Sequence, residues 1–208
     1  MIYGELPTSL GIYECAIEEM FFYQYLPIKL SGGMSPIYEG RLKPFDKIIG
    51  GVCCDYIGAF GVNKYIESNV YITAKHLFQL PNCEFNRAGW HSDGFLTDDI
   101  NYIWCDNTPT TFNSSKFTLS NDHNKSMLEM NVQALPTNNV KYSPNELLRL
   151  NQYNIHKVTS ITEPGMRTFL KVSFSLEKYN LIGNSHNYLL DYKWDMKPRS
   201  VERNHPVK

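Results

Sequence analysis

The feature that most constrains the fold of this chain is a series of short, β-rich segments, separated by turn residues, from residue 69 onward. We predict strands at residues 70–78, 100–105, 110–112, 117–119, 128–134, 152–158, 168–175 and 187–194. Short strands at a spacing of about 8–12 residues are typical of a β-sandwich or β-barrel. An aromatic content of 13%, with 14 tyrosines, also favours strands over a helical bundle.

The residues before this series predict a different structure. Residues 9–25 carry a partly apolar stripe at helical spacing that ends before Pro27, so we predict a helix there. Residues 40–61 look irregular, and the apolar run 48–53 fits either a strand or a buried loop. A capping box at residues 143–146 predicts one more short helix within the β-rich part. We therefore expect a single domain in three parts: an N-terminal helical and irregular support (1–68), a β core (69–195) and a polar tail (196–208).

A candidate metal site lies at residues 90–94. If this stretch is extended, side-chain alternation places His91 and Asp93 on one face and Ser92 on the other. One imidazole and one carboxylate make two-thirds of a facial triad, which leaves three adjacent positions open on an octahedral Fe(II). The best third ligand is His156, in the β-rich run 152–158. The competing interpretation is a surface His-Asp pair and an unrelated core histidine.

Arg167 follows His156 by eleven positions, at the start of the most strand-like segment of the chain. With His91-x-Asp93 and His156, it resembles the Fe(II)- and 2-oxoglutarate-dependent oxygenases, with the spacing of prolyl-hydroxylase-like and phytanoyl-CoA-hydroxylase-like members. The resemblance covers roughly residues 70–175 and identifies no subfamily. It implies a mainly β fold, a double-stranded β-helix (jelly roll, cupin-like) supported by N-terminal helices.

The resemblance also implies the roles of several side chains. His91, Asp93 and His156 would bind Fe(II), and 2-oxoglutarate would chelate the metal beside O2. Arg167 would hold the distal carboxylate of this co-substrate through a bidentate fork that never deprotonates. The enzyme would oxidise a substrate, most simply by hydroxylation, with succinate and CO2 as co-products.

Further candidates each have a simpler structural explanation. Tyr102 or Ser173 could help to hold the distal carboxylate, although hydroxyls on strands are mostly structural. Arg87 could bind an anionic substrate, or it could be a solvated loop residue. Trp90 and Trp104 could line a substrate pocket, although buried aromatic residues belong more often to the core.

Charge and cysteine content narrow the partners. A net charge of −1 without a basic stripe makes a nucleic-acid partner unlikely, so a small polar substrate is favoured. The five cysteines form no CxxC pair, and we find no signal peptide and no membrane-spanning run. These features predict a reduced, cytoplasmic protein that does not insert into a membrane. The sequence leaves the oligomeric state open.

A non-catalytic jelly-roll binding or structural module is the alternative to the enzyme, because jelly rolls also serve lectins and capsids. Geometry separates the two hypotheses. In the enzyme, the three ligand atoms should converge to within about 3–3.5 Å of one another, and Arg167 should point into the same cavity.

Overall fold

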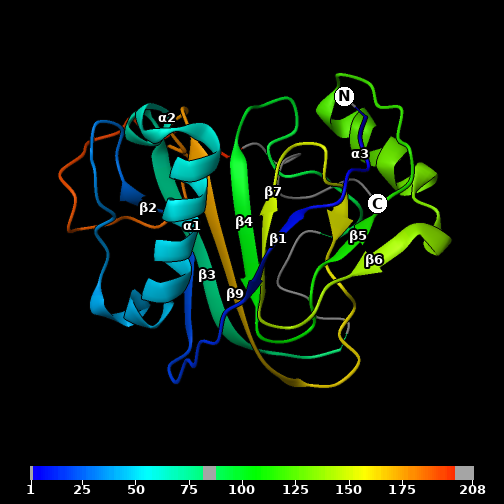
Figure 1. Cartoon of the computed structure of the whole chain (residues 1–208), viewed down its shortest axis with the longest axis horizontal. Helices are drawn as coiled ribbons and strands as arrows, with labels where there is room; N and C mark the ends of the chain where they lie inside the picture. The colour runs from blue at the N-terminus through cyan, green and yellow to red at the C-terminus, as the bar shows by residue number, and fades with distance from the viewer. Residues whose placement is uncertain (1, 82–87, 200–208) are drawn as a thin grey trace.

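A computed structural model gives the fold and describes residues 2–81 and 88–199. Its main element is a six-stranded antiparallel sheet with the order β1-β7-β4-β9-β3-β2 (Figure 1). The strands of this large sheet are β1 (Thr8–Ile12), β2 (Phe21–Lys29), β3 (Asn69–Gln79), β4 (Ile100–Cys105), β7 (Glu146–Leu150) and β9 (Gly165–Ser175). At its centre β3 and β9 pair along their whole length, from Asn69 opposite Ser175 to Gln79 opposite Gly165.

A small antiparallel sheet contains β6 (Asn139–Lys141), β5 (Thr111–Asn113) and β8 (His156–Lys157), in that order. An isolated bridge between His156 and His91 continues it beyond β8. From β3 onward the chain visits the two sheets in turn: β3, the His91 bridge, β4, β5 and β6, β7, β8 and β9. The protein is therefore mainly β, with antiparallel sheets and a few helices, as the strand series predicted.

The two faces of the large sheet have different partners (Figure 1). One face packs under η1 (Gly40–Phe45), α1 (Asp46–Phe60) and α2 (Val62–Glu67), where Leu170, Val172 and Phe174 of β9 belong to the main hydrophobic core. The opposite face meets the small sheet, because Ile103 and Phe169 cluster with Phe112 of β5. This second face also carries buried polar side chains of β9, which a purely structural interface does not require.

Two predictions for the N-terminal part were wrong. Residues 9–25, predicted as a helix, contain β1 and the first half of β2. Their aromatic residues suit strands, and pairing with β7 and β3 overrides the local helical pattern. Residues 48–53, predicted as a strand or loop, lie in α1, which buries Ile48, Ile49, Val52 and Tyr56 at helical spacing. Gly51 allows close packing there, because a Cβ atom at this position would lie 2.6 Å from the Tyr13 hydroxyl.

Three predictions in the β-rich part were also wrong. Residues 128–133 belong to α3 (His123–Gln133) and Ala134 is its C-cap, while the N-cap Asp122 accepts a hydrogen bond from the amide of Lys125. The capping box at 143–146 does form its hydrogen bond from the Ser143 amide to Glu146, but it leads into β7 and not into a helix. The left-handed φ of 64° at Asn145 is incompatible with a helix at this point. Residues 187–194 form no strand.

The remaining segments are short. The predicted strand at 117–119 is reduced to one bridge between Tyr3 and Phe117, and η2 (Pro136–Asn138) precedes β6. The strands predicted at 70–78, 100–105 and 168–175 are confirmed, and those at 110–112 and 152–158 are confirmed in part. At the beginning of the predicted tail, Lys197 pairs in parallel with Leu181, and residues 200–208 lie outside the described part of the chain. No helix within residues 2–81 and 88–199 combines the length and apolar character that crossing a bilayer requires.

Candidate metal centre

The structure brings His91, Asp93 and His156 together between the two sheets. One ligand atom from each residue can be chosen so that the three lie within 4.8 Å of one another. The imidazole ring centroids of the two histidines are 4.5 Å apart, and Nε2 of His156 lies 3.7 Å from Oδ2 of Asp93. This group is the one set of three or more His, Cys, Asp or Glu residues, within the part of the chain that the structure describes, whose geometry could hold a metal ion.

Backbone pairing places the two imidazoles side by side. His91 and His156 exchange two N–H···O=C hydrogen bonds of 2.9 Å each, so they form a hydrogen-bonded antiparallel pair. Residues directly opposite in such a pair present their side chains to the same face. The metal site therefore depends on the joining of two segments that lie 65 positions apart in the sequence.

A hydrogen bond at the Nδ1 atom of each histidine fixes the orientation of its imidazole ring. Nδ1 of His91 lies 3.0 Å from the carbonyl oxygen of Gly89, and Nδ1 of His156 lies 3.0 Å from that of Asn154. A carbonyl oxygen only accepts, so each Nδ1 carries the proton and each Nε2 keeps its lone pair. Burial lowers the pKa of His156, against the opposing effect of Asp93, and so favours the neutral form that binds metals.

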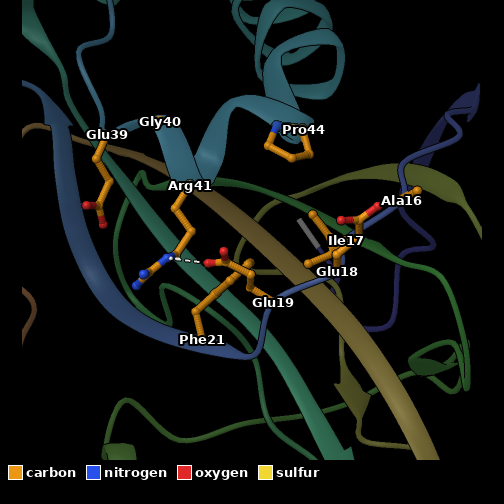
Figure 2. Close-up of a pocket in the computed structure, with 9 residues that line it drawn as sticks. All are labelled: Ala16, Ile17, Glu18, Glu19, Phe21, Glu39, Gly40, Arg41 and Pro44. Carbon is orange, nitrogen blue, oxygen red and sulfur yellow. Dashed lines mark hydrogen bonds and ion pairs between the residues drawn. The ribbon is translucent and has the colours of Figure 1, made fainter.

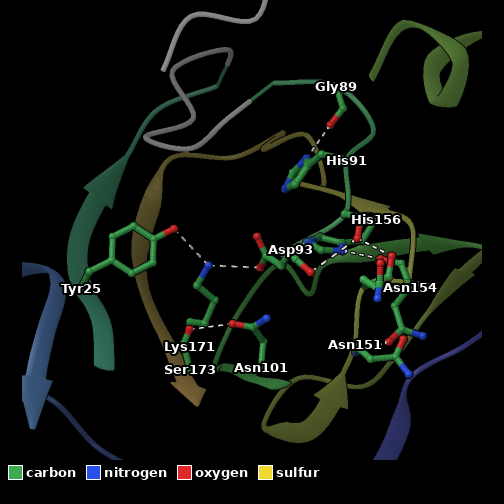
Figure 3. Close-up of polar contacts among 12 residues, drawn as sticks. Tyr25, Gly89, His91, Asp93, Asn101, Asn151, Asn154, His156, Lys171 and Ser173 are labelled. Atoms are coloured by element: carbon green, nitrogen blue, oxygen red, sulfur yellow. Dashed lines mark hydrogen bonds and ion pairs between the residues drawn. The ribbon is translucent and has the colours of Figure 1, made fainter. Parts of the chain in front are cut away.

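Asp93 lies in a turn and not in the extended strand that we predicted for residues 90–94. The chain turns at residues 93–96, where Gly94 has a φ of 70° and the Thr97 amide donates to the Gly94 carbonyl. Oδ2 of Asp93 accepts a hydrogen bond of 3.1 Å from Nζ of Lys171 (Figure 3). Burial would raise the pKa of Asp93, but Lys171, His156 and His91 hold it well below its ordinary value. Asp93 is therefore an anion throughout the neutral pH range.

Arg167 lies on the same face of β9 as Lys171, since four positions separate them along the strand. It is buried, with 5% of its surface exposed. Its Nε donates to the carbonyl oxygens of Asn107 and Thr108, at 2.9 and 3.3 Å, and its guanidinium lies over the Phe169 ring. These contacts hold the guanidinium in place, and the Arg167 side chain also hydrogen-bonds the Cys105 thiol. Its terminal N–H groups are donors of the kind that a carboxylate needs.

The other residues predicted on strands lie on different faces of the large sheet. Ser173 lies on the face that carries Arg167 and donates to Oδ1 of Asn101. The structure does not bring Tyr102 and Trp104 to the triad, because both belong to the core beneath α1. The Tyr102 hydroxyl donates to Asp55, and Trp104 Nε1 donates to the carbonyl oxygens of Tyr13 and Asn145.

The two remaining substrate candidates lie elsewhere. Trp90 is buried in a separate apolar cluster with Phe117, Met130 and Ile155. Lys157 covers its ring, so this side chain contributes to packing beside the triad. Arg87 lies outside the described residues.

Three polar side chains at this site received no role from the sequence: Tyr25, Asn101 and Lys171. Alternation does place Lys171 on the face of Arg167, because an even number of residues separates them. Tyr25 could not be placed, since it belongs to a segment predicted as a helix. Asn101 lies in a correctly predicted strand, but its contact with Ser173 requires the pairing of β4 with β9.

A separate hollow lies between the β1–β2 connection and η1 (Figure 2). Its lining residues are Ala16, Ile17, Glu18, Glu19, Phe21, Glu39, Gly40, Arg41 and Pro44. Arg41 and Glu19 form an exposed ion pair there, with Nε and Oε2 3.1 Å apart. None of the triad residues lines this hollow, so it is distinct from the candidate metal centre.

Comparison with known proteins adds no assignment, because no protein-family model matches this chain and no curated protein matches it. The functional conclusion therefore rests on the geometry of the site.

Proposed function

We propose that the protein is an Fe(II)- and 2-oxoglutarate-dependent dioxygenase that hydroxylates or otherwise oxidises a small polar substrate. The observation that carries this proposal is the convergence of His91, Asp93 and His156 with both Nδ1 atoms bound to backbone carbonyls. Two neutral imidazoles and one carboxylate on one side of a cation form the facial triad of non-haem Fe(II) oxygenases.

The arrangement of strands supports a double-stranded β-helix. In that fold the chain alternates between two facing antiparallel sheets, and β3 to β9 alternate in this way. The triad lies between the sheets, with His91 and His156 on the small sheet and the Lys171 partner of Asp93 on the large one.

The donor set fits a divalent metal ion after a small closure. Ligand atoms about 2.0–2.2 Å from one ion and at right angles to each other lie about 3 Å apart. Here Nε2 of His156 and Oδ2 of Asp93 are 3.7 Å apart and the whole set spans up to 4.8 Å, which is wider than the sequence-based expectation. Lys171 contributes to this width, because its hydrogen bond draws Oδ2 of Asp93 toward β9. Side-chain rotations that bring the most widely separated ligand atoms closer by up to about 1.8 Å, from 4.8 Å to about 3 Å, close the difference.

Arg167 supports the choice of 2-oxoglutarate. It is a buried cation on the face of β9 that carries Lys171, four residues from the side chain that touches Asp93. A buried guanidinium needs an anionic partner or several acceptors, and the distal carboxylate of 2-oxoglutarate would be such a partner. With this co-substrate and O2, bound Fe(II) supplies the oxidising chemistry, while the chain orients the reactants and excludes water.

Metal and co-substrate binding test the proposal directly. Purified protein is titrated with Fe(II) and then with 2-oxoglutarate under anaerobic conditions, and binding is followed by calorimetry and absorbance. His91→Ala and Asp93→Ala should abolish metal binding while the protein stays folded by circular dichroism. The matched control is His186→Ala, because His186 contacts Tyr188 and Tyr192 and none of the triad.

The outcome separates the enzyme from a non-catalytic jelly-roll module. Undiminished Fe(II) binding in both triad variants would rule out this metal site. Metal binding without 2-oxoglutarate binding would indicate another kind of metalloprotein. The formation of succinate from 2-oxoglutarate in the presence of Fe(II) and O2 then measures the reaction itself.

A further inference from the structure

Three polar side chains gather on the large sheet beside Asp93: Tyr25 of β2, Asn101 of β4 and Lys171 of β9 (Figure 3). Asn101 lies directly opposite Ser173 across the β4–β9 pair, which makes it the diagonal neighbour of Lys171. Diagonal neighbours on one face of a sheet are close enough for long side chains to share a ligand.

Asn101 presents a buried donor group without an acceptor. Its side-chain oxygen accepts a hydrogen bond of 2.6 Å from the Ser173 hydroxyl, which fixes the orientation of the amide. Nδ2 is buried and has no hydrogen-bond partner among the described residues, and the residue is 2% exposed. It is close to the metal-binding turn, because a Cβ atom on Gly94 would lie 3.8 Å from it. An unsatisfied buried donor destabilises the protein, and an acceptor on a ligand would remove that cost.

Lys171 offers a second donor at the same place. Two of its three N–H groups have acceptors among the described residues, namely Asp93 Oδ2 at 3.1 Å and the Tyr25 hydroxyl at 3.4 Å. The ammonium is therefore anchored beside the triad with one donor remaining for a ligand.

Tyr25 is held toward the site in a strained backbone conformation. Its φ is 48°, and it lies where the pairing of β2 with β3 changes register between Tyr23 and Leu26. The Tyr25 amide donates to Oγ1 of Thr73, which stabilises this irregularity. A left-handed conformation is strained for a non-glycine residue and is concentrated at functional sites. The irregularity turns Tyr25 toward Lys171, where its hydroxyl accepts from the ammonium and can donate its own hydrogen onward.

Cationic side chains share this face of the large sheet. Lys171 and Arg167 lie on β9, and their repulsion, after the larger effect of burial, lowers the pKa of nearby Lys75 to about 8. Asp99 also lies close, because its Cβ atom would be 3.1 Å from a Cβ atom on Gly94, and its carboxylate accepts from the Tyr179 hydroxyl. The preference for an anion therefore rests on the two donors, Asn101 Nδ2 and Lys171 Nζ, and not on the net charge of the region.

We infer that the substrate is an organic anion whose carboxylate is bound by Asn101 Nδ2 and Lys171 Nζ, with the Tyr25 hydroxyl beside them. This inference rests on the proposed function and gives the chemical class of the substrate. Along β9 the order is Arg167, Lys171 and then Ser173, and Asn101 of β4 lies opposite Ser173. The subsite is therefore on the opposite side of Lys171 from Arg167. The two carboxylate sites, one for co-substrate and one for substrate, therefore do not overlap.

Calorimetry with matched pairs of small molecules tests the inference. The protein is loaded with Mn(II) and saturating 2-oxoglutarate, without O2, and titrated with carboxylic acids and the primary amides of the same carbon skeletons, from acetate and acetamide to N-acetylated amino acids. Loss of one charge-assisted hydrogen bond corresponds to about tenfold or more in affinity. We expect the best carboxylate to bind at least tenfold more tightly than its amide. Asn101→Leu should remove most of this difference, and Asn101→Asp should reverse it.

The results distinguish this inference from the proposed function. Affinity for 2-oxoglutarate alone is measured first, and it should be equal in the wild type and in Asn101→Leu. If Asn101→Leu weakens 2-oxoglutarate binding, its donor serves the co-substrate and the inference is overturned. Equal binding of acids and amides by the wild type, or no binding of any acid, overturns the inference and leaves the proposed function intact. Failure of the wild type to bind 2-oxoglutarate overturns both.

Discussion

The ammonium group of Lys171 lies 3.1 Å from Oδ2 of Asp93, so a metal-ligand candidate is paired with a buried cation of the facing sheet. The Lys171 side chain is 10% exposed and that of Asp93 is 21% exposed. Burial would lower the pKa of Lys171, but Asp93 and Tyr25 raise it above its ordinary value, so the pair is ionised at neutral pH. This pairing holds the carboxylate in place and also sets a positive charge beside the proposed metal.

Replacing Lys171 by Met should separate these two effects. The variant keeps all but the last heavy atom of the side chain's length and leaves Asp93 without its cation, so the free energy of unfolding should fall by up to about 3 kcal/mol. A divalent metal then becomes the main partner of Asp93, and Mn(II) should raise the melting temperature of Lys171→Met more than that of the wild type. Thermal unfolding with and without Mn(II) measures both quantities. Lys125→Met, at an exposed position of α3, is the control, and an equal metal-induced shift in all three proteins would contradict the prediction.

Arg167→Lys should weaken 2-oxoglutarate binding without affecting the metal. Lysine keeps the charge but lacks the planar fork, so at least one charge-assisted hydrogen bond of about 1.5–3 kcal/mol should be lost. Calorimetry with the metal-loaded protein measures the loss as roughly tenfold or more. Arg149→Lys is a matched control, because Arg149 donates to Asp55 far from the triad. A loss of the same size in both variants would mean that Arg167 acts only through stability.

The triad could be predicted from sequence because its chemistry is visible at short range. His91 and Asp93 share a three-residue segment, and residue type together with spacing from Arg167 singled out His156. The strands β4 and β9 were predicted because their β-branched and aromatic residues are dense enough to signal a strand without knowledge of the neighbours. Alternation along β9 also accounts for the position of Ser173 on the face of Arg167, since an even number of residues separates them.

The rest of the site depends on hydrogen bonds between distant segments. The strand β2 exists because it pairs with β3 more than 40 residues later, and no local pattern in residues 9–25 reveals that pairing. Tyr25 reaches the site through an irregularity within that pairing, so its role was invisible as well. The helix α1 was missed for the opposite reason, since Gly50 and Gly51 weaken its local signal while burial of Ile49 and Val52 stabilises it.

Thr73→Val should release the Tyr25 amide and disturb the subsite that Tyr25 forms. The substitution keeps the side-chain shape but removes the oxygen that accepts from this amide at 3.1 Å. We expect a loss of about 1 kcal/mol in the free energy of unfolding and faster hydrogen exchange of the Tyr25 amide, measured by NMR. Thr111→Val is the control, because Thr111 lies in β5 of the small sheet and its hydroxyl hydrogen-bonds the Thr159 hydroxyl. Unchanged exchange at Tyr25 would show that another contact holds the irregularity in place.

Lys29 provides a pH-dependent test of the fold away from the site. This residue of β2 is 1% exposed, and its ammonium donates to the carbonyl oxygens of Ser68, Ile66 and Leu30 at 2.6, 3.2 and 3.3 Å. Burial lowers its pKa from 10.5 to about 8. Between these two values the unfolded chain binds the proton more strongly than the folded protein does, so stability should rise with pH.

Comparison with Lys29→Met isolates this contribution. Methionine does not titrate, so the free energy of unfolding of the wild type, minus that of Lys29→Met, should be constant below pH 7 and increase from pH 8 to pH 9.5. The slope can reach at most about 1.4 kcal/mol per pH unit. Urea unfolding at a series of pH values measures the difference, and Lys125→Met, which removes an exposed charge, should show no such increase. A difference that falls with pH would mean that the folded protein raises the pKa of Lys29, with the three carbonyl dipoles outweighing the cost of burial.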